Sequence, residues 1–432
     1  MFDSDQGRHM YKLACKLFPY NRSLTGNGVR KTLKDIKKIL PDLTVFEVES
    51  GSKVFDWEIP DEWNIYDAYI EHESGKRFAE FSKSNLHVLG YSTPCNTKVS
   101  LDELLSHIYT QPDQPNVIPY VTSYYKERWG FCMSQNEKNN LPTGNYNVVI
   151  EAKKEPGVLE FADLVIKGKS SKEIFFSTYI CHPSMANNEL SGPVLSSALI
   201  QYIKSNFKQP EYTYRFVFSP ETIGSITYLS KNIDYLKENV VCGYNLSCVG
   251  DDRAYSHIES RMGDSLADKA LQAGLIDMEN VVFYPFLDRG SDERQYCAPG
   301  VDLPFCGFAR TKYGEYPEYH TSADNFDVVS EKGLNGSFDV MSSIIDAFEV
   351  KLFPKATIKC EPQLGKYNLY PSVSKKGVHV DFIMRLNFLA YADGNHSLFD
   401  ISNKINKNIR LIVSEAKLLQ DKGLITMSQD RS

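Results

Sequence analysis

The chain has 432 residues, which at roughly 150 residues per domain corresponds to about three domains. Hydrophobic residues make up 42% and charged residues 24% of the chain, which excludes wholesale disorder. The formal net charge of -7 argues against a protein that binds polyanions over its whole surface, although it leaves room for a small basic module.

The beginning of the chain and its cysteines bear on the cellular compartment. The segment Met1-Phe2-Asp3-Ser4-Asp5 is acidic where a signal peptide needs base, and no apolar run follows it. No stretch approaches the roughly 20 apolar residues of a membrane-spanning helix. Nine cysteines without any Cys-x-x-Cys pair favour reduced thiols over a disulfide framework. We therefore expect a soluble, cytoplasmic protein without a membrane partner.

The first 50 residues predict two helices and a strand. Helical periodicity runs from 8 to 40 and is interrupted by the polar, glycine-rich segment 21–28. Residues 43–48 then alternate as a strand does. The segment 21–28 is either a plain turn between helices, which is the favoured interpretation, or part of the wall of a site.

Residues 53–146 show the sequence pattern of an all-β module. Short aromatic and β-branched runs alternate with turns rich in Pro, Gly and Asn, and one helix is expected over 101–109. All three tryptophans, Trp57, Trp63 and Trp129, lie in this part of the chain. They can form a sugar-stacking surface, but packing in an aromatic core is the favoured interpretation.

From about 147 to 350 the pattern alternates between strands and helices, which predicts an α/β sandwich with a mixed, largely parallel sheet. The helices and strand before residue 50 are expected to join the same sheet, which makes the β module an insertion. The expected strands are 173–179, 214–218, 239–246 and 303–308, and the expected helices are 193–204, one from about 223, and 334–350.

The C-terminal part predicts a winged helix-turn-helix, because three helical segments (380–391, 398–405 and 410–422) are joined by short turns. An excess of Lys and Arg makes nucleic-acid binding possible here. It is not favoured, because Glu415 and Asp421 interrupt the basic face of the third helix and winged helices also bind proteins. The predicted organisation is a discontinuous α/β domain (1–50 and 147–352), an inserted β domain (51–146) and a winged-helix domain (355–432).

Three side chains able to bind metal follow strands of the predicted sheet. His182 comes directly after the strand 173–179, Glu221 directly after 214–218, and His320 lies in the loop before the last helix. Ligands of open α/β sheets gather beyond the carboxyl ends of strands, and imidazoles with an oxygen ligand suit zinc. In the alternative interpretation, His182 caps the next helix and His320 pairs with Asp324.

Five short motifs carry a resemblance to a known family. The motifs are Ala186-Asn-Asn-Glu-Leu-Ser-Gly192 preceded by His182, Pro220-Glu-Thr-Ile-Gly-Ser225, Asn245-Leu-Ser-Cys-Val-Gly250, Arg289-Gly-Ser-Asp292 and Tyr319-His-Thr-Ser-Ala-Asp324. In this order they resemble the metal motifs of the co-catalytic zinc aminopeptidases. The whole chain is similar to a bacterial group with an aminopeptidase-like domain, an inserted β domain and a C-terminal winged helix, whose members are often associated with surface-polysaccharide biosynthesis clusters.

The resemblance implies a zinc-aminopeptidase-like α/β/α sandwich, but the chain departs from the family's ligand pattern. Ser184, Asn188, Thr222 and Ser247 stand where the family has carboxylates. Losing these carboxylates removes the negative charge needed to hold two dications about 3.5–4 Å apart. The resemblance therefore implies one zinc ion rather than two, held by three side chains: His182, either Asn188 or Glu189, and His320.

Glu221 and Asp292 are the catalytic residues that the resemblance implies. Glu221 would act as general base, although it can instead be the carboxylate ligand of the metal. Asp292 would either orient His320 or bind a substrate amine. Asp251 and His257 can replace a lost ligand, but solvated loop residues are the favoured interpretation of both.

The expected function is a zinc-dependent, aminopeptidase-like hydrolase that cleaves an amide or peptide bond with a metal-activated water. A peptide or a small amide such as an acylated amino sugar is the expected substrate, and a homo-oligomer is possible. The alternative is a catalytically degenerate peptidase fold that acts as a ligand-binding or regulatory protein, with the winged helix binding DNA or protein.

Overall fold

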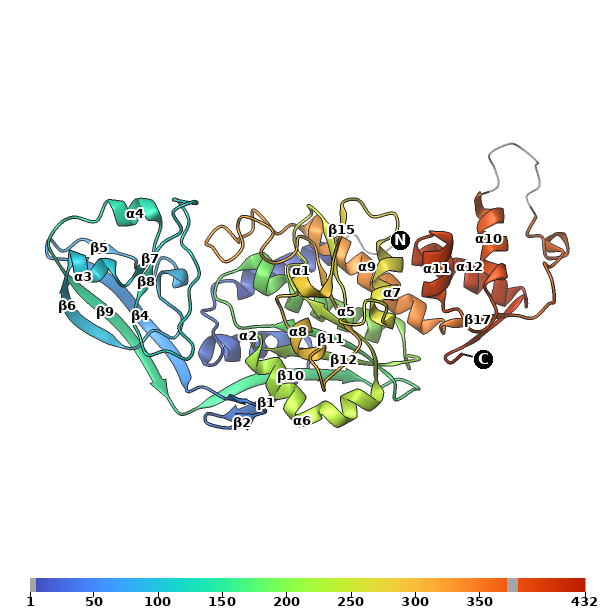
Figure 1. The fold of residues 1–432 in the computed structure, drawn as a ribbon, viewed down its shortest axis with the longest axis horizontal. Helices are drawn as coiled ribbons and strands as arrows, with labels where there is room; N and C mark the ends of the chain where they lie inside the picture. Colours follow the sequence, from blue (N-terminus) through green and yellow to red (C-terminus); the bar gives the residue numbers. More distant parts are fainter. Residues whose placement is uncertain (1–4, 371–379, 432) are drawn as a thin grey trace.

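The computed structural model describes residues 5–370 and 380–431 and contains a central eight-stranded sheet (Figure 1). Its strands are β1 (Thr44–Glu49), β10 (Val158–Ile166), β11 (Glu173–Tyr179), β12 (Thr213–Ser219), β13 (Val240–Leu246), β14 (Tyr255–Ile258), β15 (Val281–Tyr284) and β16 (Phe305–Ala309). They follow the order β1-β10-β12-β11-β13-β16-β14-β15. The four central strands β12, β11, β13 and β16 run parallel, whereas β10 and β14 run antiparallel to them. The mixed, largely parallel sheet is therefore confirmed.

Helices cover both faces of this sheet, because alternate residues of its strands point to opposite sides. Phe176 of β11 lies in the apolar core formed with α1, α2, α5, α7 and α9, whereas its neighbour Phe175 packs in a second core under α6 and α8. Every residue of β11 and β12 is buried, as expected for parallel strands covered on both faces. The helices are α1 (Gln6–Leu17), α2 (Asn27–Ile39), α5 (Ser191–Asn206), α6 (Ile223–Asn239), α7 (Leu266–Leu275), α8 (Glu293–Tyr296) and α9 (Glu331–Glu349).

The stretch 247–302, which the sequence pattern presents as loop-rich, contains β14, α7 and β15. The two strands have four residues each, and β15 is half exposed, so neither produces a long apolar run. The start of α7 does carry a local signal, since Ser265 and Asp268 form a capping box.

A smaller, four-stranded sheet forms one end of the molecule, on the left in Figure 1. Its order is β5-β4-β9-β6, and β9 runs straight on toward β10 of the central sheet. We propose that this sheet is the body of the inserted domain, which then ends near Gly157 rather than at 146. The strands are β4 (Glu62–His72), β5 (Arg77–Phe78), β6 (Cys95–Ser100) and β9 (Asn145–Glu155), with the short elements β2 (Lys53–Val54), β3 (Trp57–Glu58), β7 (Ile108–Tyr109), β8 (Phe131–Cys132), α3 (Leu101–Leu105) and α4 (Gln135–Asn139) nearby in the chain.

The opposite end of the molecule is the winged helix. It consists of β17 (Phe353–Ala356), α10 (Val380–Ala390), α11 (Leu398–Ile405), α12 (Ile409–Asp421) and β18 (Ile425–Ser428), and β17 pairs antiparallel with β18. The bounds of α11 agree with the sequence pattern, because Ser397 and Asp400 form a capping box at its start.

The winged helix is packed against the central body through its last two helices. Helix α11 contacts α7, and α12 contacts α9. Arg410 at the start of α12 donates to the carbonyl oxygen of Asp339 in α9 at 2.6 Å and lies 3.3 Å from its carboxylate. Glu415, which the sequence suggests as an interruption of a basic surface, is instead buried and pairs with Arg385. One side of α12, the third helix of the winged helix, therefore packs against the central body.

Two general features accompany this fold. None of the helices in the described part of the chain is both long and apolar enough to cross a membrane. The nine cysteines, all within the described residues, are free thiols, and six of them are buried.

Candidate active site

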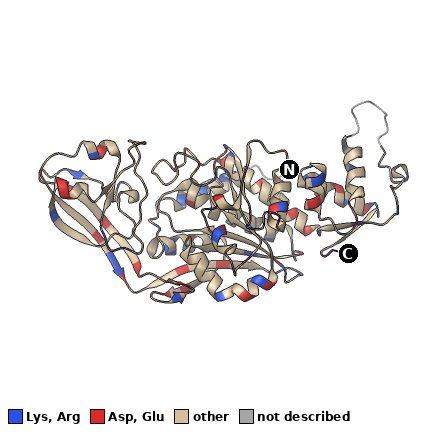
Figure 2. Cartoon of the chain, in the orientation of Figure 1, with Lys and Arg blue, Asp and Glu red and all other residues tan. Residues whose placement is uncertain are grey.

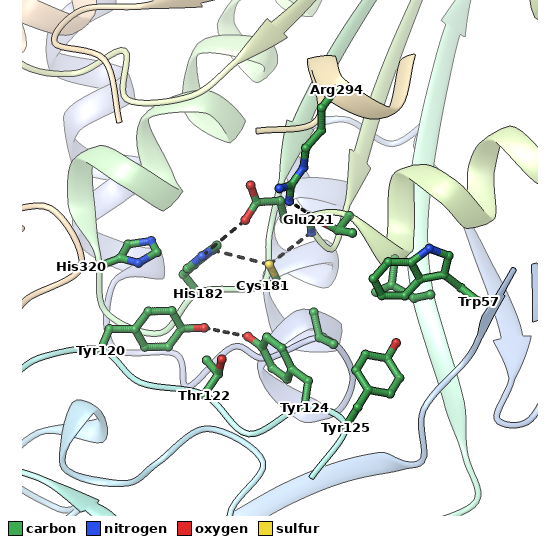
Figure 3. Close-up of a pocket in the computed structure, with 13 residues that line it drawn as sticks. Trp57, Tyr120, Thr122, Tyr124, Tyr125, Cys181, His182, Glu221, Arg294 and His320 are labelled. Carbon is green, nitrogen blue, oxygen red and sulfur yellow. Dashed lines mark hydrogen bonds and ion pairs between the residues drawn. The ribbon is translucent and has the colours of Figure 1, made fainter. Parts of the chain in front are cut away.

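A cavity of about 390 Å³ opens where β11 and β12 end (Figure 3). Cys181 and His182 follow β11, whereas Glu221 and Thr222 follow β12, so the pocket lies at the carboxyl edge of the parallel strands. A loop of the insertion supplies one wall. The remaining lining residues are Leu24, Trp57, Tyr120, Thr122, Tyr124, Tyr125, Ile223, Arg294 and His320.

His182 is held from behind by a carboxylate. Its Nδ1 lies 2.9 Å from Glu189 Oε2, and its Nε2 lies 3.7 Å from Glu221 Oε2 on the pocket side. When Glu189 is ionised it can only accept a hydrogen bond, so Nδ1 carries the proton and donates, which leaves the Nε2 lone pair directed at the pocket. Burial, together with Arg22, lowers the pKa of His182 to about 3. The imidazole is therefore neutral, as a metal ligand must be.

Glu189 is in turn paired with a buried arginine. Arg22 Nε lies 3.3 Å from Glu189 Oε1 and donates to the carbonyl oxygen of His182 at 2.8 Å. Burial raises the pKa of Glu189 to about 8, and Arg22 acts in the opposite direction by favouring the carboxylate. Arg22 belongs to the segment 21–28, and Leu24 from the same segment lines the pocket. This segment is thus part of the site wall rather than a plain turn.

His320 lies beside His182 on the next loop. The two imidazole ring centres are 5.2 Å apart, and the stacked ring of Tyr319 supports His320 from one side. Its Nε2 is buried and forms no hydrogen bond within the described residues. Burial, with His182 as the smaller cause, lowers the pKa of His320 to about 3. His320 therefore offers a second neutral imidazole with an unused ring nitrogen.

The insertion holds the His320 loop from the other side. The backbone N–H of Tyr120 donates to the carbonyl oxygen of His320 at 2.8 Å, and Ser322 N–H donates to Ile118 O at 2.8 Å. The ring of Tyr120 lies 5.2 Å from those of both histidines, and its hydroxyl is 2.7 Å from that of Tyr124. The site is therefore assembled from the α/β body and the insertion together.

Glu221 carries the carboxylate that faces both the pocket and His182. Its side chain is 22% exposed, and in the described part of the chain it accepts no hydrogen bond. Burial, with Asp292 as a second cause, raises the pKa of Glu221 to about 8. A bound cation would lower the pKa of Glu221 again, because a nearby positive charge favours the ionised carboxylate.

Four non-glycine residues at this edge of the sheet have strained backbone conformations. Ser184, Thr222, Cys248 and His320 all have positive φ values, between 30° and 64°. A residue with a Cβ in this region costs about 1–3 kcal/mol and persists only where its surroundings hold it. Such strain is concentrated at ligand and catalytic sites in many proteins, and here it lies in the loops that carry His182, Glu221 and His320.

Neutral side chains with hydrogen bonds of their own occupy three positions where the resembled enzymes have carboxylates. Ser184 Oγ donates to Phe18 O at 2.9 Å, and Thr222 Oγ1 accepts from Arg294 Nη2 at 2.6 Å. The side-chain oxygen of Asn188 accepts from the hydroxyl of Tyr179 at 2.8 Å, and Asn188 does not line the pocket. These groups have the partners that a neutral side chain needs and carry no charge that would hold a second dication.

The carboxylates of Asp292 and Asp324 bind groups other than His320. Asp292 Oδ1 accepts from Thr222 N at 2.8 Å and from Ser225 Oγ at 3.0 Å, so this carboxylate holds the Glu221 loop rather than His320. Asp324 accepts from the backbone N–H groups of Asn187 and Asn188, so the alternative interpretation, in which His320 pairs with Asp324, is wrong.

Asp251 and His257 are buried rather than solvated, and each is engaged away from the pocket. Asp251 accepts from Thr311 N at 2.9 Å. His257 pairs with Asp268 at 2.9 Å, beside Cys306. The carboxylate of Asp268 also accepts from Ser260 and Ser265, which fits a helix-capping role. Neither Asp251 nor His257 replaces a lost ligand at the pocket.

Sequence patterns do not reveal the remaining members of the site. Arg22, Arg294, Tyr120 and Tyr124 occur in segments without any motif spacing, and three distant parts of the chain contribute them. Arg294 follows Asp292 by two residues, which is the one local signal that pointed toward it. Contacts over more than 100 residues, such as that between Arg22 and His182, are decided by the tertiary fold.

The sandwich, the strand order and the position of the pocket define an aminopeptidase-like α/β fold. A zinc aminopeptidase from Bacillus subtilis is similar in fold, with 12% identity, a TM-score of 0.58, and coverage of 78% of this chain and 94% of the enzyme. At this identity the likeness concerns the fold alone.

The chain belongs to the family described as "Domain of unknown function (DUF4910)", whose model matches residues 11–351, and a winged helix-turn-helix model matches 353–427. A Clostridium acetobutylicum protein named "Putative polysaccharide biosynthesis protein with aminopeptidase-like domain" is 40% identical over 419 residues, 96% of this chain and 95% of the relative. The crystal structure of a "putative peptidase" from Clostridium acetobutylicum has 39% identity and a TM-score of 0.90, covering 98% of this chain and 97% of that one. The resemblance to zinc aminopeptidases and the C-terminal winged helix are both confirmed.

Proposed function

We propose that this protein is a zinc-dependent hydrolase that cleaves an amide or peptide bond. The observation that carries the proposal is a set of three donors without hydrogen bonds around one pocket: His182 Nε2, His320 Nε2 and the carboxylate of Glu221. Two imidazoles and one carboxylate, with a fourth position open to water or substrate, make up a catalytic zinc site in many hydrolases.

One distance within this set, between His182 Nε2 and Glu221 Oε2, is close to that between two ligands of a single ion. Two ligand atoms that share a tetrahedral zinc at about 2 Å lie roughly 3.3 Å apart. His182 Nε2 and Glu221 Oε2 are 3.7 Å apart, close to that value. We therefore assign Glu221 to the ligand set in preference to a role as general base only. One zinc is favoured over two, because Asn188 and Thr222 provide no charge for a second ion.

Another group of donors, Cys181, His182 and Glu189, has ligand atoms within 4.8 Å of one another. It is a poor place for a dication, because the Arg22 guanidinium lies 3.3 Å from Glu189 and repels a cation there. We propose that Glu189 positions His182 instead. A carboxylate that orients a ligating imidazole in this way is a common feature of zinc sites.

In the proposed reaction, zinc would polarise the amide carbonyl and lower the pKa of a water molecule to about 7. The residues of the chain supply the geometry. Glu189 and Arg22 fix the ring of His182, Tyr120 and Tyr319 fix His320, and Asp292 holds the backbone after Glu221. Because Glu221 is the one carboxylate among the lining residues, it is also the group nearest to take up a proton.

Metal analysis of the purified protein tests this proposal. We expect one zinc per chain, and a His320→Ala variant should retain less than about a tenth of it, because only two ligands remain. His396→Ala is the matched control, since His396 lies in the winged helix and pairs with Asp393. Two zinc ions per chain would contradict the single-ion site, and metal-free protein after zinc loading would contradict the hydrolase.

The neutral side chains of Ser184, Asn188 and Thr222, each with a hydrogen-bond partner in the fold, support a second candidate, a degenerate peptidase fold that binds a ligand without cleaving it. This candidate predicts that ligand affinity survives removal of His182 and His320. The hydrolase predicts that product release stops in the same variants. Isothermal titration and product analysis on one preparation separate the two.

For the winged helix we propose a structural role in packing against α7 and α9 rather than DNA recognition. Arg410 pairs with Asp339, and Figure 2 shows basic and acidic residues interspersed over the whole molecule. We expect fluorescence anisotropy with duplex DNA to give a dissociation constant no tighter than about 10⁻⁴ M at physiological salt. Micromolar binding that weakens steeply with salt, and that Lys417→Glu reduces, would contradict this role.

We further propose that the protein acts in the cytoplasm, in polysaccharide biosynthesis. Nine free cysteines support a reducing compartment, and the printed name of the Clostridium acetobutylicum relative supports the process.

A further inference from the structure

Arg294 is the one permanently charged cation among the residues that line the pocket. It extends from α8 to the side of Glu221 (Figure 3). Of its guanidinium nitrogens, Nη2 donates to Thr222 Oγ1, whereas Nε is buried without a hydrogen-bond partner. No carboxylate of the described chain lies within ion-pair distance of Arg294.

The acidic residues next to Arg294 in sequence do not account for it. Asp292 is held by Thr222 N and Ser225 Oγ, and Glu293 accepts from Gly290 N, Ser291 N and Tyr313. Asp292 Oδ1 and Glu293 thus have neutral donors within the fold, whereas Asp292 Oδ2 is buried without a hydrogen-bond partner. A guanidinium with unused donors beside an open pocket is suited to an oxyanion of a ligand, which it binds with planar, directional hydrogen bonds.

The charge around Arg294 narrows the kind of anion. Arg294 is one cation in acidic surroundings, because Asp292 and Glu293 precede it in sequence and Glu221 lies beside it in the pocket (Figure 3), so a singly charged carboxylate fits better than a doubly charged phosphate. The far end of the pocket is aromatic. Trp57 is 40% and Tyr125 56% exposed, with ring centres 5.9 Å apart, and they offer an apolar surface to a ring or acyl chain.

We propose that Arg294 selects substrates that carry a carboxylate close to the scissile amide, as an N-acyl amino acid or a dipeptide does, with an apolar group against Trp57 and Tyr125. This inference rests on the proposed function, because only a hydrolase would cleave the bound molecule. Binding of the carboxylate by Arg294 does not depend on cleavage. Arg294 is then a specificity-determining residue, and Thr222, in place of a family carboxylate, orients its guanidinium.

A pair of probes that differ only in the carboxylate tests the inference on the full-length protein. Isothermal titration with N-acetyl-L-tyrosine and N-acetyl-L-tyrosinamide should give at least about tenfold tighter binding of the acid, the size of one charged hydrogen-bonded contact. In Arg294→Gln the two affinities should lie within about twofold of each other, whereas Arg294→Lys should keep part of the preference.

Arg253→Gln is the matched control, because Arg253 pairs with Glu318 outside the pocket lining, and it should keep the full preference. Thermal melting of each variant checks that the fold is intact. Equal binding of the two probes, no binding of either, or a preference that survives in Arg294→Gln would overturn the inference. Absence of zinc or of turnover would overturn the proposed function instead and leave the binding comparison intact.

Discussion

Replacing His182 by alanine is expected to remove the bound zinc and to lower amide hydrolysis by roughly 1,000-fold or more, because the metal supplies several kcal/mol of transition-state stabilisation. His182 presents Nε2 to the pocket 3.7 Å from Glu221 and Nδ1 to Glu189 at 2.9 Å, so its ring lies between the two carboxylates. Zinc content and product release, measured on the same sample, check this result.

Substitutions of Glu189 and Glu221 should have different effects, because the two carboxylates contact opposite nitrogens of the His182 imidazole. Glu221→Gln removes a ligand and should lose both zinc and activity. Glu189→Gln keeps an oxygen that can accept from Nδ1 but removes the charge behind the ring and the ion pair with Arg22, and should weaken zinc affinity by about 10–100-fold, measured by competition with a chelator. Full zinc occupancy with no activity in Glu221→Gln would instead indicate that Glu221 acts as a general base.

Replacing Arg22 by methionine is expected to lower the free energy of unfolding by about 3–5 kcal/mol, because it leaves Glu189 buried without its cation. Arg22 is 1% exposed, and it also donates to Leu17 O at 2.7 Å and to His182 O at 2.8 Å. Both carbonyl groups would lose a buried partner, which adds to the cost. Urea denaturation followed by circular dichroism measures the change.

Two further variants separate the buried charge from the loss of packing. Combining Arg22→Met with Glu189→Gln removes both charges and should recover part of the lost stability. Lys204→Met is the exposed control, because its pair with Asp42 lies at the surface and such pairs contribute about 0–1 kcal/mol. An Arg22→Met protein as stable as the control would mean that Glu189 is protonated in the native state and needs no cation.

Much of the fold could be predicted because its central elements have strong local patterns. The strand 173–179 contains the apolar run Ile174-Phe175-Phe176 without alternation and has the bounds of β11, since parallel strands covered on both faces need no alternation. The helix 398–405 begins at a Ser-x-x-Asp capping box. By contrast, β14 and β15 are four residues long and lie at the edge of the sheet, where pairing with neighbours rather than composition decides the structure.

Tyr120, in a loop of the insertion, shows why local sequence patterns do not predict the whole site. Tyr120 lies about 60 residues before His182 in sequence, yet its backbone N–H holds the carbonyl oxygen of His320. Nothing in the run of prolines and aromatic residues around 115–125 indicates that contact. It exists because the insertion folds back over the carboxyl edge of the central sheet.

By itself the sequence determined which side chains stand after strands, namely His182, Glu221 and His320, because the position of a residue along the chain relative to an apolar run is a local property. It also determined that Asn188, Thr222 and Ser184 are uncharged. Only the tertiary structure decided that Glu189 lies behind His182 with Arg22, that Asp292 holds the Glu221 loop, and that Arg294 is left without an acidic partner. These are contacts between distant segments, and they are set by how the loops at one sheet edge pack and by which charges burial allows.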